Sequence, residues 1–214
     1  MKVSLASDTM MLLELEPLVD PVVNAKAIHL ASLLRARLGR AVRDVVPSYC
    51  TVGIHFDPLL TDLGALERAV QEEARQLPPD EPAATEPPRQ ISVRYGGDDG
   101  PDLASVAEFA GCTPDDVIER HSTRIYRVYM IGFVPGFCYM GRVDTSIAAP
   151  RRRVPRERVP AGSVGIAGEQ TGVYPISTPG GWQLIGRTDV VMFDADRTPP
   201  SLLQPGELVQ FVPA

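Results

Sequence analysis

The residues best suited to chemistry gather in one segment, residues 132 to 187. Five arginines stand within eight positions there: Arg151, Arg152, Arg153, Arg156 and Arg158. A guanidinium group presents its donors in a fork that matches a carboxylate or a phosphate, so an arginine cluster without lysine favours anion recognition. The usual alternative is a solvated loop whose arginines pair with acids such as Glu157. We expect one or two of the five to line a site, with Arg151 and Arg156 foremost.

Glycines surround aromatic side chains at two places in this segment. Gly136 precedes Phe137 and Tyr139, and the only tryptophan, Trp182, follows two glycines. Glycine lets a backbone approach a ligand while aromatic faces supply contact area. The alternative is a barrel corner shaped by glycine, with the aromatics in the core. Gly136, Tyr139 and Trp182 are therefore candidates for ligand contact, and Arg187 is a further candidate for anion binding.

Three more side chains are candidates for handling an amide or a proton. Gln170 and Thr171 follow the glycine-rich run AGSVGIAGE, where they either donate hydrogen bonds to a substrate or only satisfy turn backbone. His121 is expected at the end of a helix, where the helix dipole favours its protonated form. It is either a proton carrier or a histidine that satisfies helix-end carbonyl groups.

Several common active-site patterns are missing from the sequence. The glycine-rich run fits neither GxxxxGK[ST] nor GxGxxG, and no HExxH, CxxC or GxSxG occurs. Cys50, Cys112 and Cys138 are far apart and in no metal-ligand spacing, so we predict no metal and a reduced, cytoplasmic protein. Cys138 has no basic partner assigned by sequence, which favours a buried thiol. A self-sufficient hydrolase is therefore not visible.

Charge and hydropathy exclude two further classes of protein. The formal net charge of −6 argues against a general nucleic-acid binder, which needs a basic face to neutralise phosphates. Asp8, Glu14 and Glu16 interrupt the apolar residues near the N-terminus, and no run of about 18 apolar residues exists. We expect no membrane insertion.

The first part of the chain predicts a small α+β domain over residues 1–77. Strands are expected at residues 2–6, 10–15, 42–49 and 51–56, although the second run also suits a buried helix turn. One helix should begin after Asp20 and end at Gly39, and another should run from about Asp62 to residue 77. This order of elements suggests a ferredoxin-like layer.

The remainder predicts a linker and a barrel. Residues 78–89, PPDEPAATEPPR, are rich in proline and acid and favour a semi-rigid linker. In residues 90–214 we expect a strand at 91–95, helices at 102–110 and 113–121, and a strand at 125–131. Ten of the 18 glycines follow between residues 132 and 188, which favours a β-barrel of short strands and specified turns.

The quoted motifs resemble those of a known family. The runs HSTRIYRVYMIGFVPGFCYMGRVD, APRRRVPRERVPAGSVGIAGEQTGVYPISTPGGWQLIGRT and DADRTPPSLLQPGELVQFVP are similar to the family of 5-oxoprolinase B subunits, also called allophanate hydrolase subunit 1. That family includes inhibitors of a sporulation histidine kinase. The resemblance covers about residues 90 to 213.

The resemblance implies a fold, partners and a reaction. The fold would be a cyclophilin-like β-barrel preceded by a small α/β domain. The partners would be a C-type subunit, also called allophanate hydrolase subunit 2, and, in the oxoprolinase branch, a third subunit. The complex would open the lactam of 5-oxo-L-proline to L-glutamate with ATP, which this chain binds alone or only within the complex. The chain alone should be inactive.

The resemblance also suggests roles for the candidate residues. Arg151, Arg156 and Arg187 would hold phosphate or carboxylate, because an ATP-coupled lactam opening accumulates negative charge. Gln170 and Thr171 would orient the amide, and His121 would carry a proton. The alternative function is a regulatory protein that inhibits a sensor histidine kinase by docking a kinase helix on an apolar barrel face. Allophanate hydrolysis is a third possibility.

Overall fold

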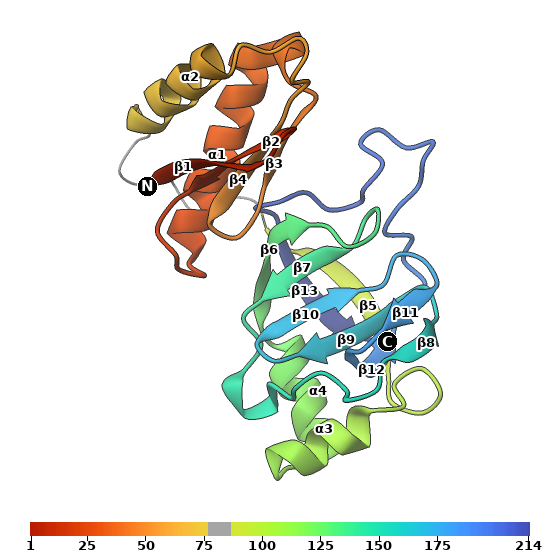
Figure 1. Ribbon diagram of the computed structural model, residues 1–214. Helices are drawn as coiled ribbons and strands as arrows, with labels where there is room; N and C mark the ends of the chain where they lie inside the picture. The colour runs from red at the N-terminus through yellow and green to blue at the C-terminus, as the bar shows by residue number, and fades with distance from the viewer. Residues whose placement is uncertain (77–86) are drawn as a thin grey trace. The chain divides into compact units, whose positions relative to one another are not determined.

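The computed structural model describes residues 1–76 and 87–214 of the chain. The chain forms two compact units, Met1–Thr85 and Glu86–Ala214 (Figure 1). Most of the predicted linker, residues 78–89, lies outside the described residues, and the domain bounds 1–77 and 90–214 stay a prediction. Arg89 already belongs to a strand of the second unit.

The first unit is a four-stranded sheet covered by two helices. Its antiparallel strands run in the order β1, β2, β4, β3 and comprise β1 (Lys2–Ser7), β2 (Met10–Glu14), β3 (Asp44–Pro47) and β4 (Thr51–His55). Helices α1 (Pro21–Leu38) and α2 (Leu63–Arg75) share one buried cluster with the sheet. The run at residues 10–15 is therefore a strand and not a helix turn.

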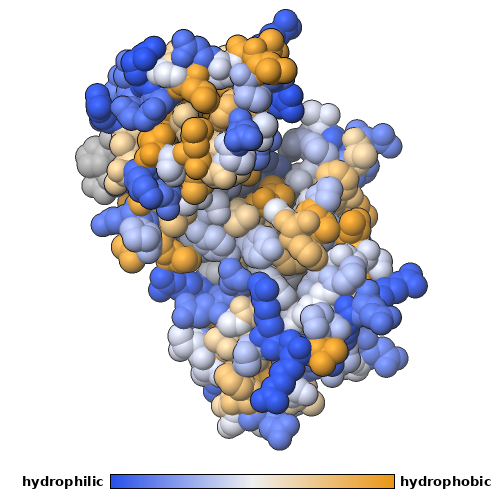
Figure 2. Space-filling model, viewed as in Figure 1, coloured by the Kyte–Doolittle hydropathy of each residue, from blue (hydrophilic) through white to orange (hydrophobic). Residues whose placement is uncertain are grey.

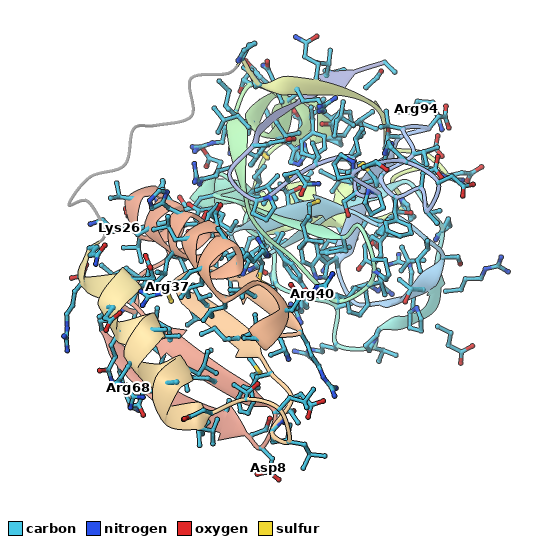
Figure 3. The ribbon with its side chains drawn as sticks, turned by 90° about the horizontal axis from the view of Figure 1, so that it is seen from above. Asp8, Lys26, Arg37, Arg40, Arg68 and Arg94 are labelled. Carbon is cyan, nitrogen blue, oxygen red and sulfur yellow. The ribbon has the colours of Figure 1, made fainter. Side chains whose placement is uncertain are left out.

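Local signals set the limits of α1. The carboxylate of Asp20 accepts hydrogen bonds from the backbone N–H groups of Val22 (2.8 Å) and Val23 (3.3 Å), which lack helical partners. At the other end Gly39 has φ +50°, which favours glycine. Arg37 forms ion pairs with two glutamates of α2, so it joins the two helices (Figure 3).

The second unit contains a closed barrel of seven strands. Their order around the barrel is β10 (Gln170–Val173), β7 (Cys138–Gly141), β6 (Ile125–Ile131), β13 (Leu208–Pro213), β5 (Arg89–Tyr95), β12 (Gln183–Arg187) and β9 (Ser163–Ala167). Strand β13 pairs in parallel with β5 and antiparallel with β6. The prediction of an α+β chain with a C-terminal barrel is confirmed.

Two short helices pack at one end of the barrel (Figure 1). Helix α3 (Leu103–Ala110) ends at Gly111, which adopts the left-handed conformation. Helix α4 (Pro114–Ser122) begins with a capping box between Thr113 and Asp116. No helix in the described ranges is long and apolar enough to span a membrane.

The barrel unit also carries a small sheet beside the barrel. Strands β8 (Arg156–Val159) and β11 (Thr178–Gly180) pair antiparallel, with Gly180 opposite Arg156. A 3-10 turn, η2 (Thr145–Ile147), precedes the arginine-rich segment. This small sheet brings the arginines close to the glycine pair that precedes Trp182.

Candidate functional site

An open pocket lies on the barrel unit between the β6–β7 loop and the small β8–β11 sheet. Its volume is about 230 Å³, and its walls are formed by Phe133, Phe137, Tyr139, Arg151, Pro155, Tyr174, Pro179, Gly180, Gly181 and Trp182. Figure 2 shows apolar side chains gathered over the part of this unit that carries the β6–β7 loop. The pocket is thus mainly aromatic, with one cationic side chain.

Phe137 is the centre of the aromatic wall. Its ring is buried and meets the rings of Tyr139, Trp182, Tyr174 and Phe133 edge to face, at centroid distances of 4.9, 5.2, 5.3 and 5.6 Å. Edge-to-face contacts fix ring orientation as well as burying area. The pocket therefore has rigid walls, apart from Phe133, whose side chain is 60% exposed.

Glycine at position 180 is required by the packing beneath it. A Cβ atom on Gly180 would lie 2.4 Å from the hydroxyl oxygen of Tyr174. The same hydroxyl accepts a hydrogen bond from the backbone N–H of Trp182, and burial raises the pKa of Tyr174. Any side chain at position 180 would therefore clash with Tyr174 and displace it.

The arginine segment is fixed by a buried carboxylate. Asp102 is 4% exposed, and its Oδ1 accepts hydrogen bonds from Arg152 (2.9 Å) and Arg156 (2.8 Å). Its Oδ2 accepts one from the backbone N–H of Leu184 at 2.7 Å. The Nη1 atom of Arg156 is buried and has no partner within the described part of the chain. Asp102 thus anchors the segment that follows Arg151.

His121 lies in the barrel interior and does not line the pocket. Its Nδ1 lies 2.8 Å from the hydroxyl of Tyr95, and its Nε2 lies 2.9 Å from the hydroxyl of Thr171. Because Thr171 donates its own proton to the carbonyl of Gly165 (3.0 Å), it must accept from Nε2–H. Tyr95 then donates to Nδ1.

Burial, and not the helix dipole, dominates the protonation of this histidine. His121 is fully buried and stacks on Phe211 at a centroid distance of 4.7 Å. Removing the ring from water disfavours its charged form and lowers the pKa of His121 to about 3. The expectation that the dipole would favour the protonated ring is not met.

The structure brings three of the predicted site residues together. Arg151, Tyr139 and Trp182 all line the pocket. Gly136 does not line the pocket. It shapes the β6–β7 loop, which forms one wall, through its φ of +80° and its close contact with Phe193. Burial raises the pKa of Tyr139.

The other predicted residues lie outside the pocket lining. Arg156 is bound to Asp102, and the Nε of Arg187 donates to the carbonyl of Ala161 at 3.0 Å. Gln170 stands in β10, where it pairs with Gly141 and Ala167, and its neighbour Thr171 is buried. Their roles in binding or catalysis stay predictions.

Phe133 and Tyr174 line the pocket but are not among the candidate site residues selected from the sequence. Phe133 stands in the quoted GFVPGF run, and Tyr174 stands in GVYP. The only signal for Phe133 is its place among glycines and a proline, because nothing local shows that its backbone takes φ +69°. Tyr174 carries no sequence signal, since its contact with Gly180 depends on tertiary packing.

The thiol of Cys138 is buried, as predicted. The residue is 0% exposed, and burial raises the pKa of the thiol to about 12. A thiol that stays protonated is a poor nucleophile. Within the described ranges, no group of three or more His, Cys, Asp or Glu side chains is placed to hold a metal ion.

A family model described as carboxyltransferase domain, subdomains C and D, matches residues 1–203. The chain belongs to this carboxyltransferase-domain family. The match includes the whole first unit and most of the barrel unit. It agrees with the resemblance found in the motifs of the barrel unit.

Curated relatives in this family are named as the B subunit of 5-oxoprolinase. The one from Escherichia coli is 42% identical over 212 residues, which are 98% of this chain and 94% of the relative. The one from Bacillus subtilis is 55% identical over 123 residues, 58% of this chain and 51% of the relative. The matched stretch thus spans about half of the Bacillus subtilis protein.

Solved structures support the same fold. TTHA0988 superposes with a TM-score of 0.83 and 36% identity over 96% of this chain, which spans only 40% of that longer chain. A conserved uncharacterized protein from Pyrococcus horikoshii is 38% identical, with a TM-score of 0.59, over 100% of this chain and 97% of that one. The urea amidolyase of Kluyveromyces lactis, at 18% identity and a TM-score of 0.79, shows the fold alone.

Proposed function

We propose that the chain is the B subunit of a 5-oxoprolinase, a heteromeric enzyme that opens 5-oxo-L-proline to L-glutamate with ATP. The observation that carries this proposal is the 42% identity that extends over 98% of the chain and 94% of the Escherichia coli 5-oxoprolinase B subunit. The match runs along nearly the whole of both proteins, so it includes both units of this chain. It favours the enzyme over a regulator of a histidine kinase.

The chemistry of the reaction explains why this chain should need partners. An unstrained lactam resists hydrolysis, and ATP can activate its carbonyl oxygen by phosphorylation. Such a step needs a nucleophile, a proton carrier and cations near the developing charge. In the described part of the chain, His121 and Cys138 are buried, so neither faces the pocket.

The partners and the nucleotide site are part of the proposal. We expect the chain to bind a subunit of the C type, also called allophanate hydrolase subunit 2-like, and a third subunit to join this pair. Because Arg151 is the one cationic side chain that lines the described pocket, we expect ATP to be held largely by another subunit. The substrate is a small lactam.

Reconstitution tests the proposed function. The purified chain is mixed with its two candidate partners, and glutamate formed from 5-oxo-L-proline is measured with and without ATP. Glutamate should appear only when all subunits and ATP are present, and each omission should abolish it. A complete mixture that hydrolyses ATP without releasing glutamate would exclude 5-oxoprolinase, as would a chain that forms no complex.

A further inference from the structure

We propose that the aromatic pocket binds the small cyclic acid itself, with the guanidinium group of Arg151 pairing with its carboxylate. This inference rests on the proposed function and adds the location and chemistry of the substrate site. The ligand class is a flat, small lactam ring that bears a single carboxylate.

Arg151 has no carboxylate partner among the described residues, and its charge acts on the neighbouring hydroxyl groups of Tyr139 and Tyr174. Its side chain lines the pocket and forms no hydrogen bond or ion pair within residues 1–76 and 87–214. Its neighbour Arg152 is held from two sides, because its guanidinium binds Asp102 and its backbone N–H donates to the carbonyl of Gly181 at 2.7 Å. The backbone beside Arg151 is therefore fixed, and its exposed guanidinium is available to pair with a carboxylate.

The walls suit a small ring. Trp182 is only 5% exposed and Phe137 is buried, so both offer fixed apolar surfaces, and the volume of about 230 Å³ suits a small molecule. Tyr139 lines the same space, and its hydroxyl has no hydrogen-bond partner among the residues described. This hydroxyl can hydrogen-bond to the amide group of the lactam while the guanidinium group of Arg151 pairs with the carboxylate.

The charge of the pocket favours the acid over the nucleotide. One unpaired arginine balances the single charge of a carboxylate. A triphosphate carries several charges and is normally held by several cations or by a row of backbone N–H groups at a glycine-rich loop. The sequence has no such phosphate loop motif, so the lactam acid is the better occupant.

Trp182 makes ligand binding directly measurable, because it is the only tryptophan of the chain and lines the pocket. Its fluorescence is followed while 5-oxo-L-proline, 2-pyrrolidinone or ATP is added to the full chain. The acid should give a saturable change, and 2-pyrrolidinone, which lacks the carboxylate, should bind at least about tenfold more weakly. A saturable response to ATP that the acid does not compete for would overturn the proposal.

Matched arginine variants provide the second test. Arg151→Gln should weaken binding of the acid by about tenfold or more and raise its KM in the assembled complex, with the KM for ATP unchanged. Arg153→Gln removes the same charge two positions away, outside the pocket lining, and should leave both constants as in the parent. Equal KM values for the two variants would refute the role of Arg151.

The two proposals fail in different ways. If the complete complex releases glutamate and Arg151→Gln leaves the KM for 5-oxo-L-proline unchanged, the proposed function stands and the pocket assignment falls. If the pocket binds the acid through Arg151 but no complex releases glutamate, the site stands and the proposed function falls. If the separate chain gives no fluorescence change, the KM of the Arg151→Gln complex for 5-oxo-L-proline decides whether the pocket assignment is correct.

Discussion

The hydroxyl of Thr171 accepts a hydrogen bond from Nε2 of His121 across 2.9 Å in the interior of the barrel. These residues belong to β10 and α4, and they are 50 residues apart in the sequence. Both residues are candidates for substrate contact, and in the structure they hydrogen-bond to each other inside the core. Because Tyr95 donates to Nδ1 and Thr171 accepts from Nε2–H, the folded structure requires the neutral form of the His121 ring.

His121 should make stability depend on pH. The unfolded ring titrates near pH 6.5, whereas the folded ring has a pKa of about 3. Between these values the unfolded state binds the additional proton, so the free energy of unfolding falls as the pH is lowered from about 6.5 toward about 3. The loss approaches about 1.4 kcal/mol per pH unit, or roughly 2 kcal/mol between pH 6.5 and 5.

Urea unfolding at a series of pH values checks this effect. His121→Gln keeps a donor and an acceptor but does not titrate. Although this variant should be less stable at pH 7, its free energy of unfolding should fall less steeply with acid than that of the parent. Parallel curves for the two proteins would show that His121 does not carry the effect.

Replacing Asp102 should destabilise the barrel unit. Asp102→Asn removes the charge that two arginines share and leaves them near a neutral amide. Because the carboxylate is buried while the arginines are partly exposed, we expect a loss of about 2 to 3 kcal/mol in the free energy of unfolding. Chemical denaturation measures this loss.

Asp189 offers the matched control for that measurement. It pairs with Arg94 at the surface of the barrel unit (Figure 3), and its side chain is 84% exposed. An exposed ion pair contributes little, so Asp189→Asn should change stability by less than about 0.5 kcal/mol. Similar losses in the two variants would mean that burial of Asp102 has no special effect.

Phe133 combines backbone strain with a place in the pocket wall. Its φ of +69° is unfavourable for a bulky residue, roughly by 1 to 2 kcal/mol. Phe133→Gly and Phe133→Ala both remove the ring, but only glycine relieves the backbone. We therefore expect the glycine variant to be about 1 kcal/mol more stable than the alanine variant, measured by denaturation. An alanine variant of equal or greater stability would contradict this account.

Cys138 should be inert toward thiol reagents in the folded protein. Its thiol is buried, with the pKa raised to about 12, whereas Cys50 and Cys112 are half-buried. Mass spectrometry after brief labelling at pH 8 should find label on Cys50 and Cys112 first, and on Cys138 only after denaturant is added. Rapid labelling of Cys138 without denaturant would place it in an accessible site.

The sequence predicted best those features that are encoded locally. Asp20 and Gly39 bound α1, and Gly111 ends α3, because caps act on backbone groups within one helical turn. The strand at residues 125–131 has the expected limits. Such signals need no knowledge of the tertiary fold.

Long-range pairing decided what the sequence could not predict. The sequence indicates anion binding by Arg156 but not that the guanidinium binds the carboxylate of Asp102, which lies 54 residues earlier in the chain. His121 carries no local sign of burial, because the aromatic ring of Phe211 that covers it comes from the last strand. Of the arginine cluster, only Arg151 lines the described pocket, whereas Arg152 and Arg156 bind Asp102.

The position of β13 has a consequence for the order of events during synthesis. Among the described residues, the strands of the first unit pair with one another and not with barrel strands, so that unit can fold while the ribosome is still translating the rest. The barrel cannot close this early, because its C-terminal strand, Leu208–Pro213, must insert between β5 and β6. Until those residues emerge, both strands keep an open edge that nascent-chain chaperones would have to protect.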